Sequence, residues 1–311
     1  MMKKNLLIGL LFVVWAASAF SISTLAAKPS KKILRVATFN NEKDFPSKKA
    51  DSKWTTRCPL VVRLLKDENF DIIGMQEPYW NQIQDLQEAL PEYAWTGVSV
   101  LGTADGSQGD ISGVRGVTAG GPRHHNPIFY KKDRFELLDK GAFWFSETPD
   151  VPASVSWDSY TVRNCNWAKF RDKLSGKEFY VFNSHFDHRG WTARAEAARI
   201  LIGKVRTLCG NTPVVCTGDY NSRDTTEPYK ILAAAKEFKD SYYMTKKHAG
   251  DEFDSFNNYN AQLRKTEKLD NFDHIFVSPN TKVKSWRLIT TRYENRFPSD
   301  HCPIVIEWKL P

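Results

Sequence analysis

The sequence predicts a single α/β domain, and three observations support this prediction. Short runs of β-branched and aromatic residues alternate with segments of helical spacing from residue 33 to the C-terminus. The roughly 280 residues that follow a short leader are enough to bury one substantial core. Several apolar runs begin or end at an acid, an amide or a histidine, which is typical of a catalytic edge of a sheet.

Residues 1–27 are expected to form a secretory signal peptide. Two lysines precede an apolar run from Leu6 to Phe20, and the small pair Ala26-Ala27 follows it. A basic start, an apolar core and a small-residue cleavage site are typical of exported chains. We therefore expect a mature domain of residues 28–311 that is periplasmic or secreted and keeps no stable membrane span. An uncleaved N-terminal anchor is the alternative, because the apolar run is long for a signal core.

Charge and cysteine content leave the class of partner open. The formal net charge is +8, and it falls to +6 when the two lysines of the leader are removed. This mild positive charge favours anionic partners but lacks the dense basic stripe of a dedicated nucleic-acid-binding protein. The five cysteines show no CxxC spacing, so neither a zinc site nor a full disulfide framework is expected, and a single disulfide stays open. Cys216 and Cys302 lie in apolar runs, which predicts that both are buried packing residues.

The first half of the domain shows a pattern of four strands and two helices. The strand-like runs cover residues 33–39, 71–75, 128–130 and 135–138, and helical spacing covers residues 59–68 and 80–90. Residues 97–121 are rich in Gly, Ser and Asp without periodicity, which predicts a long surface loop. Loops of this length inside a compact domain are often functional.

The second half of the domain predicts a hairpin, two helices and three further strands. The hairpin strands cover residues 167–170 and 179–182, the helices cover 192–208 and 228–236, and the strands cover 214–218, 272–277 and 303–306. The turn Ser175-Gly176-Lys177 joins the two hairpin strands. The first of the helices carries Ala, Ile, Leu and Val on one face, so it is expected to pack on a sheet.

Six strand-like segments begin or end at polar residues of related chemistry. These residues are Asn40, Glu77, His185, Asp219 with Asn221, Asp273, and Asp300 with His301. A buried carboxylate needs a cation or hydrogen-bond donors to offset its desolvation. Six such positions in one chain therefore indicate a shared site rather than separate turns.

Glu77 is predicted to bind a divalent metal because it leaves a buried strand at the rim of the sheet. Mg²⁺ or Mn²⁺ would suit such a site, since these ions combine one or two carboxylates with substrate phosphate oxygens. Asp300 is expected to face the metal and His301 the phosphate, because neighbours on a strand point to opposite faces. Asp273 would orient His301 and favour its charged form.

Asp219 and Asn221 are two residues apart, so an extended chain would point both side chains the same way. One could then accept a proton from water while the other donates to phosphate. A turn stabilised by the same two residues is the alternative.

Four other histidines have separate expected roles. His188 and Arg189 follow a predicted strand end, and they either contact an anionic substrate or cap the helix that follows. His124 and His125 are expected to be an exposed polar pair in a loop. His274 would point away from Asp273, which predicts a structural role.

As a set, these motifs resemble the endonuclease/exonuclease/phosphatase superfamily, whose members include pancreatic deoxyribonuclease. The resemblance is carried by Thr38-Phe39-Asn40, Gly74-Met75-Gln76-Glu77, Asn183-Ser184-His185-Phe186-Asp187-His188, Thr217-Gly218-Asp219-Tyr220-Asn221, Phe272-Asp273-His274-Ile275-Phe276 and Ser299-Asp300-His301. It covers nearly all of residues 33–310. Segments 126–135, 143–149 and 186–190 look like an exported bacterial branch of that superfamily.

The resemblance implies a deoxyribonuclease I-like, four-layer α/β/β/α sandwich, with two mixed sheets packed face to face and the site at one end. It implies these roles: metal binding by Glu77 with Asn40 and Asp300 nearby, water activation by Asp219, phosphate contacts by Asn221 and His185, and a charge clamp from Asp273 and His301. One departure lies at Asn40-Asn41-Glu42, where the family often has a second Asn two residues after the first. That departure leaves the support of the metal-site rim open.

The leading hypothesis is divalent-metal-dependent hydrolysis of a phosphodiester or phosphomonoester by in-line attack of an activated water, in a protein expected to be a monomer. The substrate stays open between nucleic acid, a sugar phosphate and a phospholipid headgroup. Activity on nucleic acid that falls steeply with salt would favour a nuclease. The alternative is a catalytically silent binding module on the same fold, at the cell surface or in the periplasm. The complete set of polar residues argues against that alternative.

Overall fold

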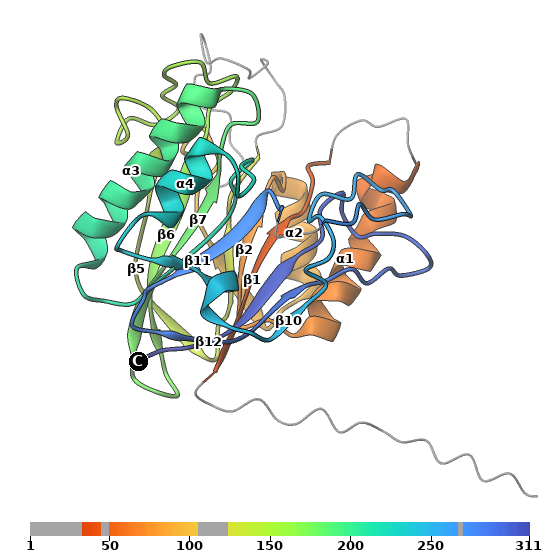
Figure 1. The fold of residues 1–311 in the computed structure, drawn as a ribbon. Helices are drawn as coiled ribbons and strands as arrows, with labels where there is room; N and C mark the ends of the chain where they lie inside the picture. Colours follow the sequence, from red (N-terminus) through yellow and green to blue (C-terminus); the bar gives the residue numbers. More distant parts are fainter. Residues whose placement is uncertain (1–32, 45–49, 105–123, 267–269) are drawn as a thin grey trace, which may run out of the picture. The chain divides into compact units, whose positions relative to one another are not determined.

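A computed structural model of the chain describes residues 33–44, 50–104, 124–266 and 270–311 (Figure 1). The predicted signal peptide lies outside the described residues, as does most of the loop predicted at 97–121. Within the described ranges, no helix combines the length and the apolar character needed to cross a membrane.

The first sheet has seven strands in the order β10-β12-β13-β1-β2-β4-β3. Its strands are β1 (Leu34–Asn40), β2 (Ile72–Gln76), β3 (Tyr93–Thr96), β4 (Ile128–Lys131), β10 (His248–Ala249), β12 (Lys282–Leu288) and β13 (Ile304–Lys309). β1 pairs in parallel with β2 and antiparallel with β13. The first and last long strands of the domain therefore lie side by side in the middle of this sheet.

The second sheet has six strands in the order β5-β6-β7-β8-β11-β9. Its strands are β5 (Phe135–Trp144), β6 (Asn164–Asp172), β7 (Glu178–His185), β8 (Val214–Asp219), β9 (Lys239–Asp240) and β11 (Asp273–Val277). β7 and β8 are parallel, and the other pairs are antiparallel. Both sheets are thus mixed, as the resemblance implied.

The helices cover the outer faces of the two sheets (Figure 1). They are α1 (Trp54–Glu68), α2 (Trp80–Ala89), α3 (Trp191–Cys209) and α4 (Glu227–Ala233), with the short 3-10 turns η1 (Ala50–Ser52) and η2 (Ser241–Met244). Apolar residues of α1 and α2 pack on the first sheet, and those of α3 and α4 pack on the second. A third apolar cluster fills the space between the sheets. The predicted four-layer α/β/β/α sandwich is confirmed.

Strands that are covered on both faces explain the continuous apolar runs in the sequence. Every residue of β2 and of β8 is buried, so neither strand shows the polar alternation of a half-exposed strand. Cys216 and Cys302 are buried, as predicted, and the five cysteines, which all lie in described ranges, form no disulfide.

Some element boundaries differ from the sequence-based prediction. α1 begins at Trp54 rather than at Pro59, and the Trp54 indole anchors this start by donating to Asp85 Oδ2 of α2 at 2.6 Å. β4 and β5 are joined by a turn in which the Arg134 amide donates to the Lys131 carbonyl at 3.1 Å, but the two strands belong to different sheets, so the turn leads the chain from one sheet to the other. β3 and β12 were not predicted. β12 contains several charged residues, and for this reason its sequence was not recognised as a strand with one buried face.

A network of side-chain amides joins the two sheets near the ends of β2 and β7. Gln76 of β2 donates to Asn183 Oδ1 of β7 at 2.6 Å, and Asn183 Nδ2 donates to the Met75 carbonyl at 2.7 Å. The sheets approach so closely at Gly74 that a Cβ there would lie 1.9 Å from Thr217 Oγ1. This contact requires glycine at position 74, because any larger residue would push the sheets apart.

Candidate active site

The polar residues predicted at strand ends meet at one end of the two sheets. The first sheet and the segments that flank its strands supply Asn40, Glu77, Asp300 and His301, and the second sheet supplies His185, Asp219 and Asp273. In the second sheet, Asp219 pairs in register with His185 on one side and with Asp273 on the other. Strand pairing alone therefore places an imidazole and two carboxylates in one row.

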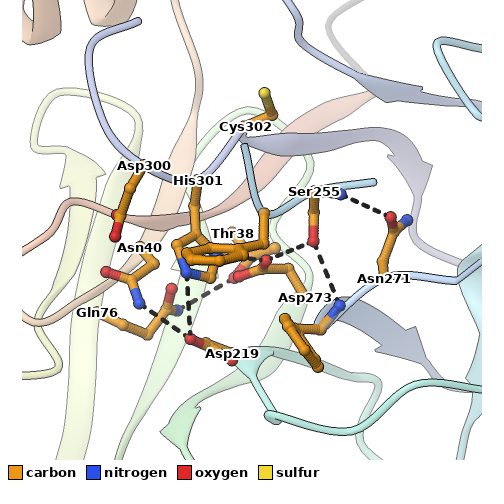
Figure 2. A network of polar contacts seen from close by, with 12 residues as sticks. Thr38, Asn40, Gln76, Asp219, Ser255, Asn271, Asp273, Asp300, His301 and Cys302 are labelled. Atoms are coloured by element: carbon orange, nitrogen blue, oxygen red, sulfur yellow. Dashed lines mark hydrogen bonds and ion pairs between the residues drawn. The ribbon is translucent and has the colours of Figure 1, made fainter. Parts of the chain in front are cut away.

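Asp219 lies at the centre of this group and is almost fully buried. Its Oδ2 accepts a hydrogen bond from Asn40 Nδ2 at 2.9 Å, and His301 Nε2 lies 3.8 Å from the same oxygen (Figure 2). His185 Nε2 lies 3.5 Å from this oxygen. Burial and the nearby Asp273 carboxylate raise the pKa of Asp219 to about 7. A carboxylate in this setting can accept a proton from water near neutral pH.

His301 is held in its charged form by Asp273. Its Nδ1 lies 2.8 Å from Asp273 Oδ2, and the Ser255 hydroxyl donates to the same carboxylate oxygen at 2.7 Å (Figure 2). Burial by itself would lower the pKa of His301, but the Asp273 carboxylate raises it well above its usual value. The expected orienting role of Asp273 matches this geometry.

Glu77 follows β2 in a left-handed backbone conformation, with φ at 74°. This conformation is unfavourable for a residue with a Cβ and is concentrated at functional sites. The Lys43 amide donates to Glu77 Oε2 at 3.2 Å. Burial alone would raise the pKa of Glu77, but the positive charges of Lys43 and Arg163 lower it to about 2. Glu77 is therefore ionised at any physiological pH.

Three carboxylates gather at the Glu77 side of the site. Burial and the neighbouring Asp300 raise the pKa of Glu42 to about 7, and burial and Glu77 raise the pKa of Asp300. Acids that repel each other in this way are stabilised by a bound cation, and an all-oxygen donor set suits Mg²⁺ or Mn²⁺. The residues present therefore fit a hard divalent metal, which Glu77 and Asp300 could hold. The Asn40 amide is engaged at both ends, because its Oδ1 also accepts from the Glu42 amide at 3.0 Å.

A second group of potential ligands consists of Asp219, Asp273 and His301, whose donor atoms lie within 4.8 Å of one another. The short Asp273–His301 contact already occupies Nδ1 of the imidazole. Binding a metal through Nε2 would require a neutral His301, whereas the Asp273 carboxylate raises the pKa of His301 and favours its charged form. The trio is better explained as a hydrogen-bonded ion pair of Asp273 and His301 beside the Asp219 carboxylate.

Comparison with known proteins is consistent with this geometry. A sequence model of the Endonuclease/Exonuclease/phosphatase family matches residues 58–301. The chain belongs to this family. A mannosyl-6-phosphatase of Bacteroides thetaiotaomicron is 35% identical, with a TM-score of 0.79 over 89% of this chain and 100% of that one. A family protein from Bacteroides vulgatus is also 35% identical, with a TM-score of 0.78 over 90% of this chain and 99% of that one.

Curated relatives are more distant. An uncharacterized protein of Acanthamoeba polyphaga mimivirus is 29% identical over 55% of this chain. The chain spans 60% of the length of that relative and 39% of the length of a second mimivirus protein.

The family motif at Asp219 ends in a turn rather than in extended chain. Asn221 has a φ of 47°, its amide donates to Asp219 Oδ1 at 2.9 Å, and its Nδ2 donates to the Phe186 carbonyl at 3.1 Å. The expectation of an extended segment with both side chains on one face is wrong. It is the turn, and not an extended strand, that places Asn221 beside Asp219.

His188 and Arg189 lie exposed at the rim of the site. His188 Nδ1 is 3.0 Å from Arg163 Nη2, and the Arg189 guanidinium lies 4.0 Å from the centre of the Tyr160 ring. The helix-capping alternative is wrong, because the Asp158 carboxylate accepts from the Thr192 and Ala193 amides at the start of α3. Substrate contact stays a prediction for both residues.

The prediction of an exposed pair at His124 and His125 is also wrong. His125 is fully buried, with its ring centre 6.0 Å from that of Trp80, and its amide donates to the Pro78 carbonyl at 2.9 Å. The His124 ring centre lies 6.1 Å from that of His185. Burial and the charge of Arg163 lower the pKa of His124 well below its usual value. Hydrogen bonding just before β4 draws both imidazoles inward, so His124 joins the site as a neutral group.

His274 has the structural role that was predicted. Its Nε2 lies 2.9 Å from the Ser222 carbonyl, and its Nδ1 lies 3.4 Å from Asp240 Oδ2. Arg163 and Glu42, by contrast, were missed by sequence reasoning. β6 begins at Asn164, three residues before the predicted run, so Arg163 looked like a loop residue although it immediately precedes a strand.

Proposed function

We propose that this protein is a divalent-metal-dependent phosphoesterase that hydrolyses a phosphate ester by in-line attack of water. The observation that carries the proposal is the position of Asp219 between two imidazoles, close to a cluster of carboxylates. A base, hydrogen-bond donors for phosphate and a site for a hard cation are the groups that phosphoryl transfer requires. Membership of the Endonuclease/Exonuclease/phosphatase family supports the proposal.

Each residue has a defined task in this proposal. Asp219 accepts a proton from the attacking water, and the Asn40 amide fixes its orientation. Protonated His301 donates from Nε2 to a non-bridging phosphate oxygen, and neutral His185 can donate to another. Glu77 and Asp300 would hold the metal, which neutralises phosphate charge and polarises the ester when bound. Asn221 holds the turn after Asp219 in place.

A sugar phosphate is the first substrate class to test. The support comes from the mannosyl-6-phosphatase that is 35% identical over nearly its whole length. The exposed rim residues Tyr160, His188 and Arg189 offer an aromatic ring and hydrogen-bonding groups that suit a hydroxyl-rich leaving group.

The test uses purified protein with Mg²⁺ or Mn²⁺ and a panel of mannose 6-phosphate, p-nitrophenyl phosphate, bis-p-nitrophenyl phosphate and oligonucleotides. We expect release of phosphate or nitrophenol, and Asp219→Asn should lower kcat by roughly 10²- to 10⁴-fold, since it removes a general base. Asp139→Asn, an exposed acid on β5, is the matched control and should keep full activity. Folded protein that leaves the whole panel intact with either metal would favour the silent binding module.

A further inference from the structure

Arg163 is a buried arginine whose hydrogen bonds are incomplete. Its side chain is only 7% exposed, and its Nε has no hydrogen-bond partner among the described residues. Nη2 makes one contact of 3.0 Å, with His188 Nδ1. A guanidinium carries five N–H donors and stays charged, so burying it in this way is costly unless a ligand completes its contacts.

The nearest acid, Asp187, is already occupied by other donors. Its Oδ1 accepts from the Arg189 and Gly190 amides, and its Oδ2 accepts from Ser159, Tyr160 and Thr161. The Arg163 Nε–Asp187 Oδ2 distance is 3.9 Å, which is too long for a hydrogen bond. Asp187 therefore organises its own loop, and it leaves much of the Arg163 charge uncompensated.

The charge of Arg163 acts on the catalytic carboxylates. Its electrostatic field contributes to the lowered pKa of Glu77, and it in turn interacts with Glu77 and Asp219. The same charge helps to keep His185 and His124 neutral. Arg163 directly precedes β6, in which Cys165 pairs with Ser184 of β7, one residue before His185, so the arginine lies at the same end of the second sheet as the site and supplies a positive charge there.

We propose that Arg163 binds a non-bridging phosphate oxygen and makes the site prefer dianionic phosphomonoesters over monoanionic diesters. This inference rests on the proposed phosphoesterase function. A guanidinium suits the task because its planar fork binds two phosphate oxygens at once and its charge does not depend on pH near neutrality. Hydrolysis forms the P–O bond to water and breaks the ester P–O bond, and Arg163 transfers no proton.

The experiment compares p-nitrophenyl phosphate with methyl p-nitrophenyl phosphate, which share a leaving group and differ by one charge. We expect the wild type to prefer the monoester. Arg163→Met should lower kcat/KM for the monoester by roughly 10- to 100-fold, the loss expected for one hydrogen bond to a charged group. The diester should lose much less, and the inhibition constant of inorganic phosphate should rise in parallel with the monoester loss.

Arg194→Met is the matched control. Arg194 is another buried arginine of the same region, and its Nη1 donates to the Asp187 carbonyl at 3.0 Å. The carboxylates that affect the pKa of Arg194 are Asp187 and Asp158, neither of which is in the catalytic group. Replacing it should affect both esters equally. Arg163→Lys keeps the positive charge but cannot bind two phosphate oxygens at once, so it should retain part of the monoester preference. This variant also tests the proposal if Arg163→Met fails to fold.

The outcomes separate the two proposals. Equal losses on both esters in Arg163→Met and Arg163→Lys, or no loss in either, would overturn the role of Arg163 while leaving an active phosphoesterase. A folded wild type that hydrolyses neither ester would overturn the proposed function, and the inference with it.

Discussion

Three residues at the rim of the site adopt left-handed backbone conformations although none is glycine. They are Glu42, Glu77 and Asn221, with φ values of 49°, 74° and 47°. Each follows the end of a strand, and the left-handed turn redirects its side chain. Such conformations cost of order 1 kcal/mol each, so packing and hydrogen bonds elsewhere must hold them in place.

His274 gives a residue-scale prediction about pH and stability. Burial alone would lower its pKa, but Asp240 raises it, so the folded protein favours protonated His274. The resulting stabilisation is complete below the unfolded value near 6.5 and is lost as pH rises through the higher folded pKa. We expect the stability difference between wild type and His274→Gln, measured by urea unfolding, to shrink as pH rises from 6 toward 9. A difference that stays constant over this range would contradict the assignment.

The sequence identified most of the candidate site at residue scale because its members lie at the ends of apolar runs. Asp219, Asp273 and His185 fall in one row once the strands pair, and no further information is needed. The sequence did not predict Arg163 and His124 as site residues, because their positions depend on tertiary hydrogen bonds. His124 follows a Gly-rich segment, and only its contacts with residues near Val100 and His185 draw it into the site.

At the scale of elements, the site depends on how two sheets are aligned. The side-chain Nδ2 of Asn183 on β7 donates to the carbonyls of Met75 and Pro127. The Oδ1 of Asn183 accepts a hydrogen bond from Gln76 Nε2. Buried amides of this kind are costly when unsatisfied and specify one arrangement when satisfied. They fix the distance between Glu77 on one sheet and Asp219 on the other.

Gly74 provides the matching element-scale prediction. Ala at this position would place a Cβ 1.9 Å from Thr217 Oγ1 and 2.6 Å from Asn183 Oδ1. We expect Gly74→Ala to lower the free energy of unfolding by about 1–3 kcal/mol, as overpacking does, and to reduce kcat. Gly203→Ala on α3 is the control, because a Cβ there meets nothing within 4 Å, and it should stabilise by up to about 1 kcal/mol. Similar effects from both substitutions in urea unfolding would refute the close sheet contact.

The prediction of helices and strands succeeded where apolar residues recur at a clear helical or strand period. It failed where charged residues interrupt that period. α2 and α3 were located to within a residue or two because their apolar residues recur at helical spacing. β12 was missed because Lys282, Lys284 and Arg287 dominate its sequence, although every buried position of the strand is apolar. The assignment of neighbouring strands β4 and β5 to different sheets could not be read from a local pattern.

At the scale of the whole molecule, metal binding by the carboxylate cluster of Glu42, Glu77 and Asp300 should increase the stability of the folded protein. A metal that binds only the folded state stabilises it by about 2.7 kcal/mol at a hundred times its Kd. We expect Mg²⁺ to raise the Tm by several degrees in a thermal scan. Asp300→Asn should raise the Tm without metal, since Asp300 repels Glu42 and Glu77, and should reduce the shift caused by Mg²⁺. An unchanged Mg²⁺ shift in this variant would place the ion elsewhere.

The pairing of β1 with β13 has a consequence for synthesis on the ribosome. Thr38 pairs with Ile304, so β1 cannot complete its pairing until β13, more than 250 residues later, has been translated. Contacts this distant in sequence form late, and until then β1 presents an open edge that can pair with other chains. A chain that terminates before residue 300 also lacks Asp300 and His301. Chains that stop before residue 300 would therefore be both inactive in the proposed reaction and prone to aggregate.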